Sequence, residues 1–191
     1  MNLLYKFTDA NWETKNRTKW GPGVTHTAPG AGALCTEGWL HAYLSPELAT
    51  LLNPIHAAFK DPVLWEAEGE IGARDGQLKV GSAALTTVRT VEVPVFTVEQ
   101  RVKFAILCAK AVYHDPDFVA WADAWLGGAD RSYKAEAAAA WAEAAAWAAA
   151  EAEAAAAAEE AAAWAARSAA WATAATASFD LVAIAKQALE P

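Results

Sequence analysis

The stretch of sequence that decides the fold is VLWEAEGEIGARDGQLKV, residues 63 to 80. In its first half, apolar or small residues alternate with glutamates, which is the pattern of a β-strand with one buried face and one wet face. The alternating acids are Glu66, Glu68 and Glu70. Asp75-Gly76 then supplies the two residues of a tight hairpin turn. The pattern predicts one antiparallel hairpin across this whole stretch, with Arg74 opposite Gln77.

More strands are predicted on both sides of this hairpin. Residues 2 to 8 and 84 to 93 have the composition of strands, and residues 39 to 44 alternate as a half-buried strand does. The segment from residue 9 to 32 has no periodicity, and we expect it to be a long loop. The N-terminal half is therefore predicted to be rich in antiparallel β-structure.

Local chemistry marks the helix boundaries. Ser45 followed by Pro46 is typical of a helix start, because serine caps the first turn and proline fits its first position. The step Asn53-Pro54 is expected to end this helix. Thr97 to Gln100 has the pattern of a capping box, which predicts the start of a second helix.

The C-terminal half is rich in alanine and tryptophan and has apolar residues at helical spacing. The expected helices span residues 97–113, 116–126, 131–177 and 179–189, the last of them capped by Ser178. The sequence thus predicts an α+β protein with a β-rich N-terminal domain, residues 1–96, and an all-α region, residues 97–191.

Composition restricts the partners. The formal net charge is −8 and the pI is about 5.0, so phosphate backbones and anionic membranes would be repelled, and neither nucleic acid nor a membrane is expected as a partner. Charged residues interrupt the alanine tract too often for a membrane-spanning helix. The N-terminus has no pattern of a signal peptide, and Cys35 and Cys108 lie in apolar stretches as buried free thiols would. Together these features predict a cytoplasmic protein.

Four stretches resemble a known family: LCTEGWLHAYLSPELATLLNPIHAAF, LWEAEGE, QRVKFAILCAKAVY and WLGGADRSYKAEAAAA. The chain is similar in these stretches to a family of uncharacterised phage and prophage proteins with a variable, alanine-rich helical tail. The residues that carry the resemblance are Cys35, Gly38, His41, Pro46, Asn53, Pro54, His56 and residues 66 to 70. The resemblance implies a phage accessory gene, for which modifying or blocking host defence or metabolism is the expected role.

Two strand faces carry candidate binding chemistry. Trp39, His41 and Tyr43 would form an aromatic stripe on which a planar base could stack, and Glu66 and Glu68 could accept hydrogen bonds from its amino groups. Arg17 and Lys19, on the long loop, could meet phosphates. In the alternative interpretation the glutamates are the wet face of a hairpin and the aromatic residues pack on the C-terminal helices.

The sequence patterns of other kinds of functional site are less complete. His26, His41, His56 and Cys35 lack the spacing of a zinc site, so no metal and no cofactor is expected. The chain has neither a serine-hydrolase elbow nor a phosphate-binding loop. The order of Tyr5, Ser45 and one of Glu66, Glu68 or Glu92 has some similarity to the order of catalytic elements in ADP-ribosyltransferases.

The leading hypothesis from the sequence is a non-enzymatic, phage-type accessory binding protein. It would bind a small nucleotide-like ligand or a host protein and would act as an antagonist of host defence. The alternatives are an ADP-ribosyltransferase-like enzyme and a purely structural, self-assembling protein. An isolated helix would expose the tryptophans of the tail, so we expect homo-oligomerisation through Trp164 and Trp171. The alternative is a tail that folds back as an intramolecular bundle over the N-terminal sheet.

Overall fold

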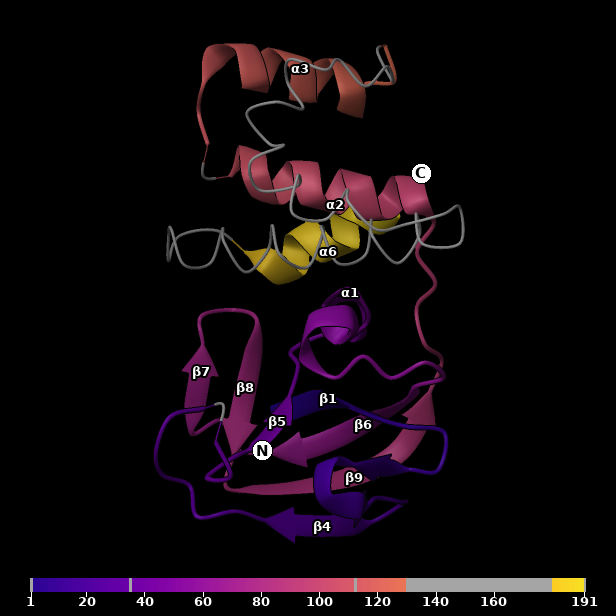
Figure 1. Ribbon diagram of the computed structural model, residues 1–191, viewed down its shortest axis with the longest axis vertical. Helices are drawn as coiled ribbons and strands as arrows, with labels where there is room; N and C mark the ends of the chain where they lie inside the picture. The colour runs from indigo at the N-terminus through magenta and orange to yellow at the C-terminus, as the bar shows by residue number, and fades with distance from the viewer. Residues whose placement is uncertain (1, 35, 112, 130–179, 191) are drawn as a thin grey trace.

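The computed structural model describes residues 2–34, 36–111, 113–129 and 180–190. The described chain is α+β, as the sequence predicts, with antiparallel sheets in the N-terminal half and helices after them (Figure 1). Cys35, Ser178, the predicted helix 131–177 and its Trp164 and Trp171 lie outside the described residues.

Three sheets are formed. The largest has four strands in the order β1 (Asn2–Thr8), β6 (Val63–Gly69), β9 (Ala84–Val91) and β4 (Val24–Thr27). The second has the order β5 (Leu40–Ala42), β8 (Lys79–Ser82) and β7 (Ala73–Asp75). The third pairs β2 (Glu13–Thr14) with β3 (Thr18–Lys19), joined by the short 3-10 helix η1 (Lys15–Arg17).

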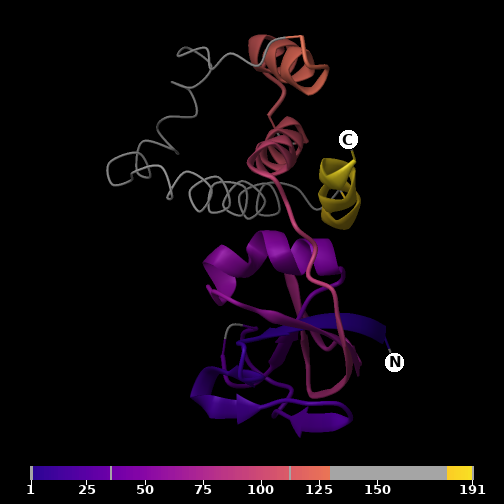
Figure 2. The ribbon, with the colours of Figure 1, turned by 90° about the vertical axis from the view of Figure 1, so that its right-hand side faces the viewer.

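Four described helices stack above the sheets. They are α1 (Pro46–His56), α2 (Val98–Lys110), α3 (Pro116–Leu126) and α6 (Leu181–Leu189). Helix α1 lies against the four-stranded sheet, α2 and α6 lie side by side beyond α1, and α3 lies farthest from the sheets (Figures 1 and 2).

The two faces of the four-stranded sheet are buried differently. One face, with Phe7 and Leu64, packs under α1 in the largest hydrophobic cluster, which also contains Phe104 of α2 and Leu181 of α6. The other face packs in a smaller cluster around Trp20. The largest cluster therefore joins the N-terminal sheet to the C-terminal helix.

The predicted helix starts at Ser45 and Thr97 are confirmed. The Ser45 hydroxyl accepts a hydrogen bond from Leu48 N at 3.1 Å, and Thr97 and Gln100 form both halves of a capping box. The last helix begins later than expected, because Asp180 caps α6 by accepting a hydrogen bond from Ala183 N at 3.0 Å.

The prediction that Asn53-Pro54 ends α1 is wrong, since the helix continues to His56. Asn53 stabilises this last turn and its exit. Its carbonyl accepts hydrogen bonds from Ala57 N at 3.0 Å and Ala58 N at 2.7 Å, and its side chain bonds both backbone groups of Phe59. Pro54 has no N–H to donate to the Thr50 carbonyl, and the bonds of Asn53 fix the turn that follows it.

The single hairpin predicted for residues 63 to 80 is also wrong. Its first half, β6, pairs with β1 and β9, while β7 pairs with β8 in another sheet. Asp75 lies opposite Lys79, so the loop is longer than the predicted two-residue turn and Arg74 does not face Gln77. The physical reason is tertiary, because this register buries the loop residue Leu78 in the largest hydrophobic cluster.

The segment from residue 9 to 32, predicted as a loop, contains the short strands β2, β3 and β4. These strands are only two to four residues long, too short for a period to be recognised in the sequence. Strand β4 completes the edge of the large sheet by pairing with β9.

Candidate ligand-binding site

A row of four polar side chains crosses the neighbouring strands on the face that α1 partly covers. Tyr43 pairs with Tyr5 through an isolated bridge, Tyr5 lies opposite Glu66 on β6, and Glu66 lies opposite Arg89 on β9. Directly opposed residues on adjacent strands have their side chains on the same face and within contact distance. The sheet topology therefore gathers these groups from four segments of the chain.

Glu66 and Arg89 form the strongest polar contact of this row. Arg89 donates from Nε to Glu66 Oε2 and from Nη2 to Glu66 Oε1, both at 2.7 Å. The Glu66 side chain is only 19% exposed, whereas that of Arg89 is 67% exposed. The guanidinium thus neutralises a half-buried carboxylate in a bidentate geometry.

A second carboxylate enters from the first turn of α1. Glu47 lies one helical turn before Leu51, which is fully buried against the sheet. The Oε2 atom of Glu47 is buried and has no hydrogen-bond partner among the described residues. A buried carboxylate oxygen without a donor is energetically unfavourable, and a group that supplies an N–H or O–H would relieve this cost.

Both acids act electrostatically on Tyr5. Burial raises the pKa of its hydroxyl, and the negative charges of Glu66 and Glu47 raise it further, while Arg89 acts in the opposite direction. Both carboxylates therefore lie close enough to Tyr5 for their charges to act on it. Tyr5 remains neutral near pH 7 and offers a ring face and a hydroxyl.

The site is open at one end of the sheet. Beyond Tyr5, the next row consists of Leu3 and Glu68, which are both exposed, and of Thr86 on β9. In the opposite direction, Phe7 and Leu64 are buried under α1. The polar row thus lies at the boundary between the covered and the open part of the sheet.

The predicted site residues Trp39 and His41 lie elsewhere. Trp39 Nε1 donates to Gly32 O at 2.9 Å, and His41 Nε2 donates to the Leu34 carbonyl. A Cβ atom at Gly72 would lie 2.5 Å from the ring of Trp39, so this ring packs closely over the glycine backbone. Both side chains hold the loop of residues 30 to 38 against β5 and β8.

Tyr43 belongs to the row but faces the interior. It is 7% exposed, and its hydroxyl forms a 3.1 Å hydrogen bond with His56 Nδ1. The two rings stack with their centroids 5.8 Å apart. Burial and the nearby Lys79 lower the pKa of His56 to about 4, and burial raises the pKa of Tyr43, so the pair is neutral near pH 7.

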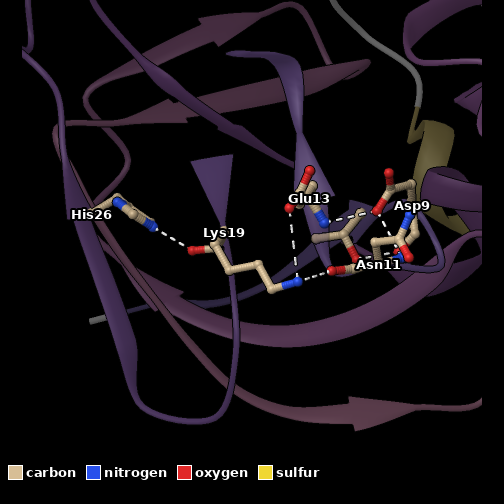
Figure 3. A network of polar contacts seen from close by, with 6 residues as sticks. Asp9, Asn11, Glu13, Lys19 and His26 are labelled. Carbon is tan, nitrogen blue, oxygen red and sulfur yellow. Dashed lines mark hydrogen bonds and ion pairs between the residues drawn. The ribbon is translucent and has the colours of Figure 1, made fainter. Parts of the chain in front are cut away.

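Arg17 and Lys19 lie on the small β2–β3 hairpin. Lys19 Nζ donates to the Asn11 carbonyl and lies 3.8 Å from Glu13 Oε1, while its backbone carbonyl accepts a 2.7 Å bond from His26 Nε2 (Figure 3). Arg17 is exposed and has a left-handed backbone with φ of 55°. The Lys19 ammonium is thus already engaged within its own hairpin.

The structure brings together only some of the predicted site residues. Glu66 and Glu68 share a sheet face with Tyr43, whereas Trp39 and His41 form a separate cluster under the 30–38 loop. Sequence reasoning missed Glu47 and Arg89. In the sequence, Glu47 is recognisable only as an acid in the first turn of a helix. The helix dipole alone explains an acid at that position.

The residues whose order is similar to that of catalytic elements in ADP-ribosyltransferases have different roles in the structure. Tyr5 and Glu66 are direct cross-strand partners. The Ser45 hydroxyl is buried and caps α1, and Glu92 is exposed after the end of β9.

Two further observations restrict the chemistry of the described part of the chain. There, no group of three His, Cys, Asp or Glu side chains is placed to hold a metal ion. The same residues include no helix with both the length and the hydropathy needed to cross a membrane. Cys108 is a buried free thiol whose pKa is raised by burial.

Comparisons of the chain with protein-family models, with curated proteins and with solved structures found no match.

Proposed function

We propose that the protein is a phage-type accessory binding protein that takes a small nucleotide-like ligand at the boundary between α1 and the open end of the sheet. The observation that carries this proposal is the buried Glu47 Oε2 atom, which has no hydrogen-bond partner among the described residues. The negative charges of Glu47 and of the half-buried Glu66 both raise the pKa of the Tyr5 hydroxyl.

The chemistry of these groups favours a planar ring with amino substituents. Tyr5 supplies a face on which a heterocycle stacks. When its side chain turns outward, Glu47 accepts a hydrogen bond from an exocyclic amino group, and Glu66 accepts a second one beside its contact with Arg89. A hydrogen bond to a charged acceptor contributes about 1.5–3 kcal/mol, so these contacts are strong enough to orient a base.

The phosphate end of such a ligand is not part of this recognition. Arg89 is bound to Glu66, and Lys19 is bound within the β2–β3 hairpin. We therefore expect bases and nucleosides to bind at least as tightly as their phosphates, because the negative charges around Tyr5 repel a phosphate group.

The resemblance to phage proteins supports a role in the cytoplasm of a host cell. There, sequestering a small amino-bearing metabolite would modify host metabolism or block a defence response. Self-association through Trp164 and Trp171 is a separate part of the proposal, and light scattering of the wild type and of the double alanine variant would test it.

A thermal-shift titration with nucleobases, nucleosides and their 5′-phosphates tests ligand binding. A member of this panel at a hundred times its Kd should stabilise the protein by about 2.7 kcal/mol. Glu47→Gln should lower this affinity about tenfold or more, because it replaces a charged acceptor by a neutral amide. Glu37→Gln, an exposed acid in the 30–38 loop, is the matched control and should leave the affinity unchanged.

Two results would contradict the proposal. One is the absence of stabilisation by every member of the panel, and the other is equal binding by the wild type and Glu47→Gln. Transfer of label from NAD to a protein of the lysate would favour the ADP-ribosyltransferase alternative instead.

A further inference from the structure

A second pocket lies far from the sheet, where the start of α2 meets the end of α3 and the end of α6. It encloses about 250 Å³ and is lined by polar side chains of α2 and by apolar ones of α3. The lining residues that define its chemistry are Thr97, Gln100, Lys103, Trp125 and Leu126. Antiparallel packing of α2 and α3 brings the two groups together.

The Gln100 side chain already forms two hydrogen bonds within the protein. Its Oε1 atom accepts from Thr97 N at 2.9 Å, and its Nε2 atom donates to Leu189 O at 3.0 Å. Gln100 therefore fixes the end of α6 against α2 and shapes the pocket wall.

Lys103 and Thr97 have hydrogen-bond donors that remain for a ligand. Lys103 Nζ donates to Glu190 O at 2.9 Å, and since an ammonium group has three N–H bonds, two remain for a ligand. The Thr97 hydroxyl accepts from Gln100 N at 3.1 Å and still has its own hydrogen to donate. Two donors that line one pocket, one of them charged, suit the oxygens of a carboxylate.

The opposite wall is apolar. Trp125 is 8% exposed and packs in the cluster of α2 and α3, with Leu126 against it. Glu99 and Glu190 line the same pocket, so an anionic ligand must place its single charge at Lys103 and away from these two acids. The volume is below the range of about 300–1,000 Å³ that is typical of drug-sized ligands, so the occupant must be small.

We propose that this pocket binds a small monocarboxylate with a short apolar body. The carboxylate accepts hydrogen bonds from Lys103 Nζ and the Thr97 hydroxyl, and the apolar body lies against Trp125 and Leu126. This site is independent of the ligand proposed for the Tyr5 site.

Hexanoate and its neutral isostere hexanamide are a suitable pair of probes, with binding measured by calorimetry or saturation-transfer NMR on the full chain. We expect hexanoate to bind at least about tenfold more tightly than hexanamide, because only the carboxylate pairs a negative charge of its own with the Lys103 ammonium. Lys103→Met, which keeps most of the side chain's length and removes its charge, should remove this preference.

Lys60→Met is the matched control, since Lys60 is exposed in the turn after α1, and it should bind hexanoate as the wild type does. Equal affinities for hexanoate and hexanamide would overturn the proposal, as would full hexanoate binding by Lys103→Met or no binding at millimolar hexanoate. The wild-type comparison of the two probes decides the question even if Lys103→Met does not fold. None of these measurements depends on Glu47 or Tyr5.

Discussion

At the scale of single residues, Lys6 is a charged side chain in a buried position. It lies on β1 and points to the opposite face from Tyr5, where it is 7% exposed. Its Nζ atom donates to His41 O at 3.0 Å and lies 4.6 Å from the centroid of the Trp20 ring. Burial lowers the pKa of this ammonium from 10.5 to about 8. The carbonyl and the aromatic face thus stabilise the cation only in part.

This shift predicts a pH dependence of stability. Between pH 8 and 10.5 the unfolded chain keeps the Lys6 proton while the folded chain releases it, so this group makes folding more favourable as the pH rises. Buried Tyr43 and Cys108 act in the opposite direction, because burial raises their pKa values. The effect of Lys6 must therefore be measured as a difference between the wild type and Lys6→Met.

We expect the free energy of unfolding of the wild type, relative to that of Lys6→Met, to increase by on the order of 3 kcal/mol between these pH values. Urea unfolding at several pH values measures this difference. Lys60→Met, with an exposed lysine removed, should show no such change relative to the wild type. A constant difference between the wild type and Lys6→Met would show that Lys6 titrates normally.

At the scale of elements, the loop of residues 30 to 38 depends on close packing against Gly81 of strand β8. A Cβ atom at Gly81 would lie 2.4 Å from Leu34 Cδ1 and 2.9 Å from Trp39 Cβ. Gly81→Ala should destabilise the protein by about 1–3 kcal/mol, since the loop and β5 must move apart. Chemical denaturation measures this loss, and hydrogen exchange should show weaker protection of the loop.

Gly21→Ala is the matched control for this substitution. There the nearest atom to an added Cβ is Val24 Cγ2 at 3.4 Å, an ordinary contact distance. A similar loss of stability in both variants would mean that the contact with Trp39 and Leu34 is not the cause.

The elements also show what the sequence can predict. Helix starts at Ser45, Thr97 and Asp115 follow from the bonding of one side chain to nearby backbone groups, so their chemistry is visible in a few residues. The register of β7 and β8 depends instead on the burial of Leu78 among residues distant in sequence. A local turn signal at Asp75-Gly76 could not outweigh that tertiary contact.

In the candidate site, too, the local pattern could be predicted and the tertiary contacts could not. Alternation in β6 identified Glu66 and Glu68 as residues of one face, and the structure has them there. The approach of Glu47 and Arg89 requires the strand order β1, β6, β9, the bulge at Glu66 and Ala67, and the placement of α1 over them. None of these arrangements is encoded in a short motif, so the partners of Glu66 could not be predicted from the sequence.

At the scale of the whole molecule, one hydrophobic cluster links the two regions predicted as separate domains. Leu181, Ala185 and Ala188 of α6 are fully buried in a cluster that also contains Phe7 and Leu64 of the sheet. The Gln77 side chain, from the loop between β7 and β8, accepts a 2.7 Å hydrogen bond from Leu181 N at the start of α6. The described parts of both regions therefore share their largest core.

This shared core predicts that the sheet and the helices unfold together. Ala185→Asp places a charge at a fully buried position and should lower the free energy of unfolding by at least about 3 kcal/mol. Ala183→Asp is the matched control, because Ala183 is exposed in the first turn of the same helix, where an acid is favourable. Hydrogen exchange should show that Ala185→Asp weakens the protection of β6 and of α2 by the same amount, since both contribute to the cluster. If β6 kept its full protection while α2 lost it, the sheet would be stable without α6, and residues 1–96 would fold as a domain of their own.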